Sequence, residues 1–220
     1  SFDVEVENPS AYAGKKIVVT FEAVINDEAD VENGVVNKLD NYGTSVQVPT
    51  TFGKFEFTKV DPDGKGIENV TFQVKDGDTT LYFVKQKDGS YKKAASAATS
   101  GATADVKTGA DGKLSFTGLD KTKTYTVTET KRASDAYLDI MPSFTVSFNE
   151  ENGSAVLAKT ATSDPWGLVN TTAKTVKNIK SITQLPLTGA AGTMLFTVVA
   201  LLVAGAGVTI AIKSRQNAEA

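Results

Sequence analysis

The chain has 220 residues, a formal net charge of −3 and a pI near 5.1. It contains no histidine and no cysteine, which excludes a Ser-His-Asp triad, a cysteine nucleophile, a thiolate zinc site and a disulfide framework. The small negative charge argues against nucleic acid as a partner. Carboxylate, lysine, hydroxyl and amide chemistry remain as the possibilities.

The first 48 residues contain only a few candidate strands, the clearest of them over residues 16–25. Because a closed sandwich needs more strands, residues 1–48 are predicted to be the C-terminal portion of a preceding β-sandwich domain. The chain opens with Ser1 and shows no signal peptide, which indicates a processed chain or a fragment. Residues 49–53 mark the expected boundary to the next domain.

Residues 52–171 contain threonine- and valine-rich segments of period two, separated by Asp-Gly and Asn-Gly turns. Many short strands with turns about every ten residues predict an all-β sandwich. Residues 94–104 are rich in alanine, serine and threonine and are predicted to form a solvated loop. The expected strands are 52–60, 70–75, 80–87, 113–116, 124–130, 143–149, 155–158 and 167–171.

Three of these strands each place one polar residue on an apolar face. Alternate residues of a strand share a face. Lys59 is therefore predicted to point with two phenylalanines, Glu129 with a tyrosine and a valine, and Asn170 with a tryptophan and a leucine. Buried lysine and glutamate are rare unless they are paired. The pattern predicts one shared site for Lys59, Glu129 and Asn170.

These three groups can react with one another. Burial favours the neutral amine of lysine and the protonated form of glutamate, and a neutral lysine amine is a nucleophile. Attack of Lys59 Nζ on the side-chain carbonyl carbon of Asn170, with Glu129 moving the proton, would release ammonia and leave an amide bond. The alternative is an unreacted hydrogen-bond network of the same three residues.

The C-terminal segment has three parts after a short polar spacer over residues 172–184. The first is the pentapeptide Leu185, Pro186, Leu187, Thr188 and Gly189. The second is an uncharged apolar run over residues 194–212, which is long enough for a transmembrane helix. The basic residues of the third part, the tail 213–220, are expected to stay in the cytoplasm. A buried core helix is the alternative for the apolar run.

The order of pentapeptide, apolar segment and basic tail resembles the cell-wall sorting signal of Gram-positive surface proteins, here residues 185–220. The resemblance implies that a sortase attacks the Thr188 carbonyl, releases Gly189 onward and passes Thr188 to an amine. Pro186 restricts the conformations of the extended substrate. On this interpretation the membrane holds the precursor only transiently.

Residues 52–171 resemble a collagen-adhesin B-type (CnaB) domain of a Gram-positive pilin. The matching segments are 57–60, 109–119, 125–130 and 169–171. The resemblance implies an Ig-like β-sandwich with an intramolecular isopeptide bond between Lys59 and Asn170, formed with Glu129 as the proton shuttle.

The same resemblance makes residues 1–48 the end of a preceding pilin domain, with Asn37 as that domain's own bond acceptor and its lysine upstream of Ser1.

The resemblance implies a structural shaft subunit of a covalently polymerised, cell-wall-anchored pilus, which is neither an enzyme nor dependent on a cofactor or metal. The expected partners are pilus-specific and housekeeping sortases, other pilin subunits through Thr188, and peptidoglycan. One alternative is a wall-anchored adhesin or minor pilin that binds host ligands, and another is a wall-anchored enzyme with its catalytic part upstream. The short spacer favours the shaft, because a monomeric adhesin needs a long stretch to cross the wall.

Overall fold

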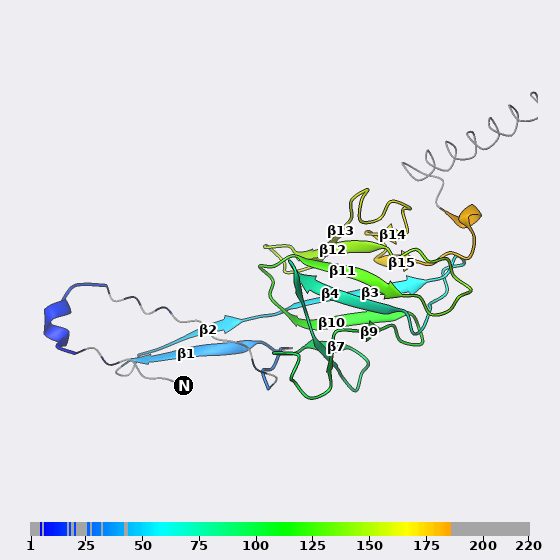
Figure 1. Ribbon diagram of the computed structural model, residues 1–220. Coiled ribbons are helices and arrows are strands. Elements are labelled where there is room, and N and C mark those ends of the chain that lie inside the picture. Colours follow the sequence, from blue (N-terminus) through cyan, green and yellow to red (C-terminus); the bar gives the residue numbers. More distant parts are fainter. Residues whose placement is uncertain are drawn as a thin grey trace, which may run out of the picture.

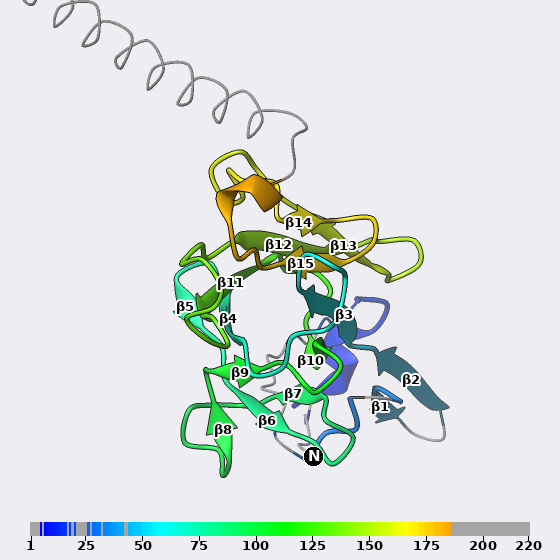
Figure 2. The same ribbon diagram turned by 90° about the vertical axis from the view of Figure 1, so that its right-hand side faces the viewer.

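The computed structural model describes residues 5, 7–16, 18, 20, 26, 28–31, 33–41 and 44–185. In this part of the chain the regular elements are strands β1 to β15 and two short 3₁₀ helices, η1 (Pro9–Tyr12) and η2 (Ile182–Gln184). The predicted all-β class is confirmed, and the strands after residue 52 form two sheets that face each other across a common core (Figures 1 and 2).

The two sheets differ in the number and order of their strands. The first sheet has the order β14-β15-β3-β10-β7-β6-β8, and the second has the order β13-β12-β11-β4-β5, with β9 also paired to β4. The first sheet comprises β3 (Gly53–Val60), β6 (Phe83–Lys85), β7 (Tyr91–Lys93), β8 (Ala102–Thr103), β10 (Lys113–Leu119), β14 (Val169–Asn170) and β15 (Thr175–Lys177). The second comprises β4 (Thr71–Asp76), β5 (Thr79–Thr80), β9 (Val106–Lys107), β11 (Tyr125–Lys131), β12 (Ser143–Phe148) and β13 (Ala155–Ala158).

The core between the sheets is built from the alternate residues of each strand that point inward. In β3, Phe55 and Phe57 are buried while Glu56 between them faces solvent, as the period of two requires. Phe55 stacks on Phe116 of β10 with ring centroids 4.6 Å apart, and Phe57 meets Phe72 and Phe144 of the second sheet edge to face. This aromatic packing joins the two sheets and fixes which face of β3 points inward.

A two-stranded hairpin precedes the sandwich. Its strands β1 (Val35–Asn41) and β2 (Thr44–Thr50) pair in antiparallel register, and they extend from one end of the sandwich (Figure 1). The sequence analysis did not predict these strands. Asn37, the expected bond acceptor of the preceding domain, lies in β1 and is exposed. Most of the predicted strand over residues 16–25 falls outside the described residues.

The segment 172–184 corrects the sequence analysis, which took it as a polar spacer. It contains β15 and η2, and β15 lies between β14 and β3 in the first sheet, where it pairs in parallel with β3 (Figure 2). The folded domain therefore continues to Leu185. A few short strands were also missed, among them β8, which lies inside the loop predicted over residues 94–104.

The predicted transmembrane run 194–212 lies outside the described residues. Among the residues that are described, no helix is long and apolar enough to cross a membrane.

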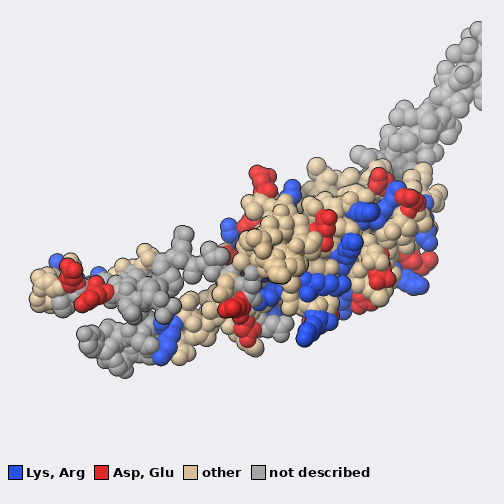
Figure 3. All heavy atoms as spheres, turned by 60° about the horizontal axis from the view of Figure 1, so that its bottom comes forward, with Lys and Arg blue, Asp and Glu red and all other residues tan. Residues whose placement is uncertain are grey.

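On the surface of the sandwich, basic and acidic side chains lie side by side on the face drawn in Figure 3, in keeping with the small net charge of −3.

Candidate functional site

Lys59 lies at the inward side of β3, where alternation predicted it. Its side chain is completely buried, and its Nζ lies 5.8 Å from the ring centroid of Phe72. The turn at Gly112 packs directly against this part of β3, because Lys59 N donates to Gly112 O at 2.8 Å. A Cβ on Gly112 would lie 2.3 Å from Lys59 O, and the residue has a φ of +78°. Only glycine fits this close approach without strain.

Glu129 enters the same region from the opposite sheet. It is 1% exposed and lies on the inward face of β11 with Tyr125 and Val127, again as alternation predicted. Its Oε2 accepts a hydrogen bond from Lys59 Nζ at 2.6 Å. The two charged groups therefore form a buried ion pair that crosses the core between β3 and β11.

Asn178 is the third member of the cluster, and the sequence analysis missed it. The residue is 2% exposed, and its Nδ2 donates to Glu129 Oε1 at 2.9 Å. Its backbone N donates to Val60 O at 2.9 Å, directly after the last pair of the two strands, Lys177 with Val60. The carboxylate of Glu129 thus holds the amine of Lys59 on one oxygen and the carboxamide of Asn178 on the other.

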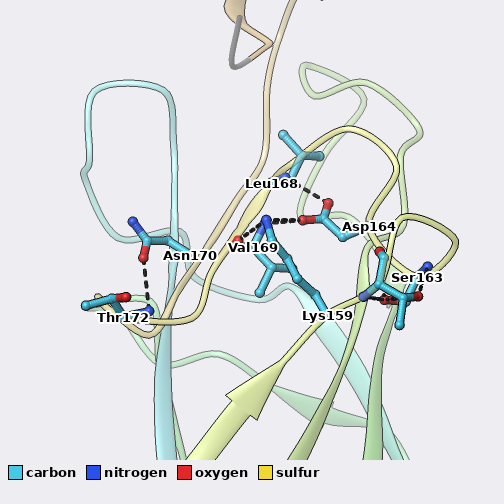
Figure 4. Close-up of polar contacts among 8 residues, drawn as sticks. Lys159, Ser163, Asp164, Leu168, Val169, Asn170 and Thr172 are labelled. Atoms are coloured by element: carbon cyan, nitrogen blue, oxygen red, sulfur yellow. Dashed lines mark hydrogen bonds and ion pairs between the residues drawn. The ribbon is translucent and has the colours of Figure 1, made fainter. Parts of the chain in front are cut away.

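Asn170, the predicted third member, does not join the cluster. It is exposed, and its Oδ1 accepts hydrogen bonds from the backbone N of Thr172 and of Ala173 at 3.1 and 3.0 Å, which closes the turn after β14 (Figure 4). Its neighbour Val169 is the residue that faces the core. The prediction was wrong because Leu168 and Val169 are buried in succession, in two different apolar clusters, so the alternation on which it depended fails between them.

A second buried carboxylate sets the path of the chain before β14. Asp164 accepts hydrogen bonds from the backbone N of Leu168 and Val169, and its Oδ2 accepts a third from Lys159 Nζ at 2.8 Å (Figure 4). Lys159 Nζ also donates to Val169 O. These contacts hold Val169 inward, so that Asn170 must face out.

Only a three-residue pattern, Val176 to Asn178, marks this position in the sequence, which is too short to predict a strand. Val176 and Asn178 are buried on either side of the half-buried Lys177, as alternation predicts, but Ile179 after Asn178 is buried as well. The segment is short and follows four residues of turn, so its polar composition concealed it. Val176 is completely buried, and Asn178 occupies the next inward position.

Burial shifts the pKa values of the ion pair in opposite directions. Desolvation lowers the pKa of Lys59 to about 8, although the charge of Glu129 and the hydrogen bond to it act the other way. Desolvation raises the pKa of Glu129, against the opposing effects of Lys59 and Asn178. Forming the neutral amine of Lys59 and the protonated acid of Glu129 therefore costs less free energy in this site than it would in water.

The polar groups of the site are satisfied by one another. In the described part of the chain, every buried side-chain nitrogen and oxygen has a hydrogen-bond partner, and no three acidic side chains converge as metal ligands. The arrangement places a nucleophile, Lys59, and a carboxamide, Asn178, in contact with the same buried proton carrier, Glu129.

The predicted sortase motif is described only at its first residue. Leu185 is buried, at 4% exposure, against the apolar residues Leu168 and Ile179. Pro186, Leu187, Thr188 and Gly189 lie outside the described residues. Leu185 is therefore in contact with the folded domain.

Two known families match the chain. The family described as SpaA, a prealbumin-like fold domain, matches residues 53–164, and the family described as the LPXTG cell wall anchor motif matches residues 180–219. The first match ends before β14 and β15, so Asn178 lies beyond it. No curated protein matches the chain closely enough to count as a relative.

Several solved structures of pilins are similar to this chain. The group B streptococcus pilus 2b backbone protein is 20% identical, with 64% of this chain and 44% of that chain covered and a TM-score of 0.35. For a double mutant of shaft pilin SpaA from Lactobacillus rhamnosus GG these values are 19%, 61%, 48% and 0.35, and for a streptococcal ancillary pilin they are 18%, 71%, 40% and 0.33. This chain spans less than half the length of each.

Proposed function

The chain belongs to the family of proteins with a SpaA prealbumin-like fold domain, and from this premise we propose that it is a shaft subunit of a covalently polymerised pilus. Its anchor region is that of a cell-wall surface protein processed by sortase, and its families are pilin and anchor families rather than enzymes. We further propose that the sandwich is of the CnaB type and is closed by an isopeptide bond between Lys59 and Asn178.

The observation that carries the proposed bond is the bridging carboxylate of Glu129. It contacts Lys59 Nζ at 2.6 Å and Asn178 Nδ2 at 2.9 Å, so one group touches both the nucleophile and the leaving group. Proximity of this kind can contribute about 7–11 kcal/mol to lowering a barrier.

The reaction balances without a cofactor. A proton moves from the Lys59 ammonium to Glu129, the neutral Nζ attacks Cγ of Asn178, and the C–N bond to the amide nitrogen breaks. Glu129 gives this proton to the departing nitrogen and takes a second proton from Nζ, so that the nitrogen leaves as ammonia and Glu129 ends protonated. The product is one amide bond between Nζ and Cγ, and no oxidant or metal is required.

The position of the proposed bond suits a protein under tension. Lys59 lies near the end of β3, the first strand of the sandwich. Asn178 directly follows β15, the last strand, and β15 is paired with β3. A pull applied before Gly53 and after Leu185 would pass through the amide and would bypass the rest of the sandwich. The bond would close a loop of more than one hundred residues, which the chain-entropy model equates to about 4.7 kcal/mol of stabilisation.

Polymerisation gives a direct test of the shaft assignment. Cells that make the full-length protein together with its sortases should show a ladder of multimers that survives boiling in sodium dodecyl sulfate, because each step is an amide bond. Replacing Thr188 by Ala should abolish the ladder. A single wall-linked band that never forms multimers would favour the alternative, a monomeric adhesin or minor pilin.

The pH dependence of bond formation tests the role of the ion pair. The reactive arrangement holds one shared proton on Lys59 and Glu129. We expect the rate to fall above about pH 8, where the lowered pKa of Lys59 lets the pair lose this proton. It should also fall on the acidic side of the raised pKa of Glu129, where the pair gains a second proton.

The rate can be followed by diluting unreacted, denatured chain into buffers between about pH 4 and 10 and recording intact mass against time. A rate that rises steadily with pH would contradict the proton-shuttle mechanism.

A further inference from the structure

Leu185, the first residue of the sorting motif, is seated in an apolar cluster of its own domain. Only 4% of the residue is exposed. We call this group the Leu185 cluster, and it consists of Leu138, Ile140, Trp166, Leu168, Ile179 and Leu185. Burying a leucine side chain stabilises the docked state by an amount that corresponds to roughly a ten- to hundredfold preference over the exposed state.

Helix η2 fixes the chain immediately before Leu185. Gln184 Oε1 accepts hydrogen bonds from the backbone N of Lys180 and Ser181, at 2.8 and 3.2 Å. Ser181 in turn accepts from Thr183 N, which completes a capping box, and Leu185 N donates to Ile182 O. This arrangement limits where the side chain of Leu185 can go.

The docked leucine cannot be held by a sortase at the same time. A transpeptidase that reads the pentapeptide must contact its side chains along an extended backbone, and one side chain cannot occupy two apolar sites. If Leu185 is undocked for only a fraction of the time, the apparent affinity of the chain for the sortase falls to that fraction of its intrinsic affinity.

We propose that Leu185 exchanges between the Leu185 cluster and the sortase, so that the folded domain itself limits the rate of sorting. This inference rests on the proposed sortase processing of the chain. Leu185 stays on the domain side of the Thr188–Gly189 bond, so after transfer it can dock again and hold the new linkage three residues from the folded domain.

A cleavage assay tests the exchange directly. The substrates are the 220-residue chain in detergent micelles and a synthetic peptide of residues 180–192, each treated with a purified sortase that cleaves Leu-Pro-x-Thr-Gly peptides. We expect the peptide to be cleaved with a kcat/KM roughly ten- to hundredfold higher than the folded chain. Replacing Gln184 by Ala removes the capping bonds and should raise kcat/KM of the folded chain about fivefold.

Two controls separate release of Leu185 from direct effects on the enzyme. Gln184→Ala in the peptide should leave its kcat/KM unchanged, because the peptide has no cluster to leave. Ile182→Ala in the full chain should also leave the rate unchanged, since that side chain is 57% exposed in η2. Trp166 is the chain's one tryptophan, so its emission should shift to the red in the Gln184→Ala chain as the cluster opens.

The outcomes distinguish this inference from the proposed function. If the peptide is not cleaved, sortase processing itself is refuted. If the peptide and the folded chain are cleaved at equal rates, and Gln184→Ala changes neither the rate nor the emission of Trp166, processing stands and the exchange of Leu185 is refuted.

Discussion

The chain in which Ala replaces Asn178 is expected to have the full mass of its sequence, whereas the parent chain should be one ammonia lighter than its own. The physical reason is that Asn178 carries the carboxamide bound to Glu129, at 2.9 Å. Without that carboxamide Lys59 has no electrophile. Intact-mass spectrometry distinguishes the two forms, and digestion of the parent should give one branched peptide that contains Lys59 and Asn178.

Asn170→Ala is the matched control. Asn170 is exposed and contacts only the backbone of its own turn, so this variant should still lose ammonia. The reverse result, with full mass for Asn170→Ala and mass loss for Asn178→Ala, would contradict Asn178 as the acceptor and favour Asn170, the residue predicted from the sequence.

Loss of the bond should also lower the thermal stability of the chain by a large amount. Removing a cross-link that closes more than one hundred residues lowers the free energy of unfolding by about 4–5 kcal/mol. For a domain of this size we expect the Asn178→Ala chain to melt about 10–20 °C below the parent. Calorimetry measures this difference, and a melting temperature within a few degrees of the parent would contradict a cross-link between Lys59 and Asn178.

The second large effect is expected for Glu129→Gln. Glutamine keeps the size and much of the hydrogen bonding of Glu129 but cannot carry a proton, so bond formation should slow by about 10²- to 10⁴-fold. The variant should therefore show the full sequence mass at times when the parent has reacted completely.

This substitution also separates two explanations of the reactivity. The charge of Glu129 raises the pKa of Lys59, so its removal makes the neutral amine more abundant. If a neutral Lys59 were sufficient, Glu129→Gln would react faster than the parent. A slower reaction shows that Glu129 acts on the proton and on the carboxamide. Glu56→Gln, on the solvent side of the same strand β3, should react like the parent.

Alternation within single strands predicted two of the three site residues. Lys59 and Glu129 lie in β3 and β11, which are 8 and 7 residues long, and such lengths let a period of two establish which face is buried. The fold class could be predicted for the same reason. The sorting motif is a local feature, and its sequence match did not depend on the fold.

Alternation failed where the chain is irregular. Strands β14 and β15 have only 2 and 3 residues, and left-handed residues at Gly167 and Lys174 lie before and between them. Leu168 and Val169 are buried in succession, so the period of two fails between them, and the alternation wrongly predicted that Asn170 points inward. Asn178 could be found only once β15 was seen to pair with β3.

The sequence by itself determined the all-β class, the burial of Lys59 and Glu129, and the sorting signal, because each depends on neighbours a few residues apart. Only the tertiary structure decided that Asn178 is the group beside Glu129 and that Leu185 docks on the domain. Both depend on which segments pack together in the fold, and such packing leaves no local periodicity to detect.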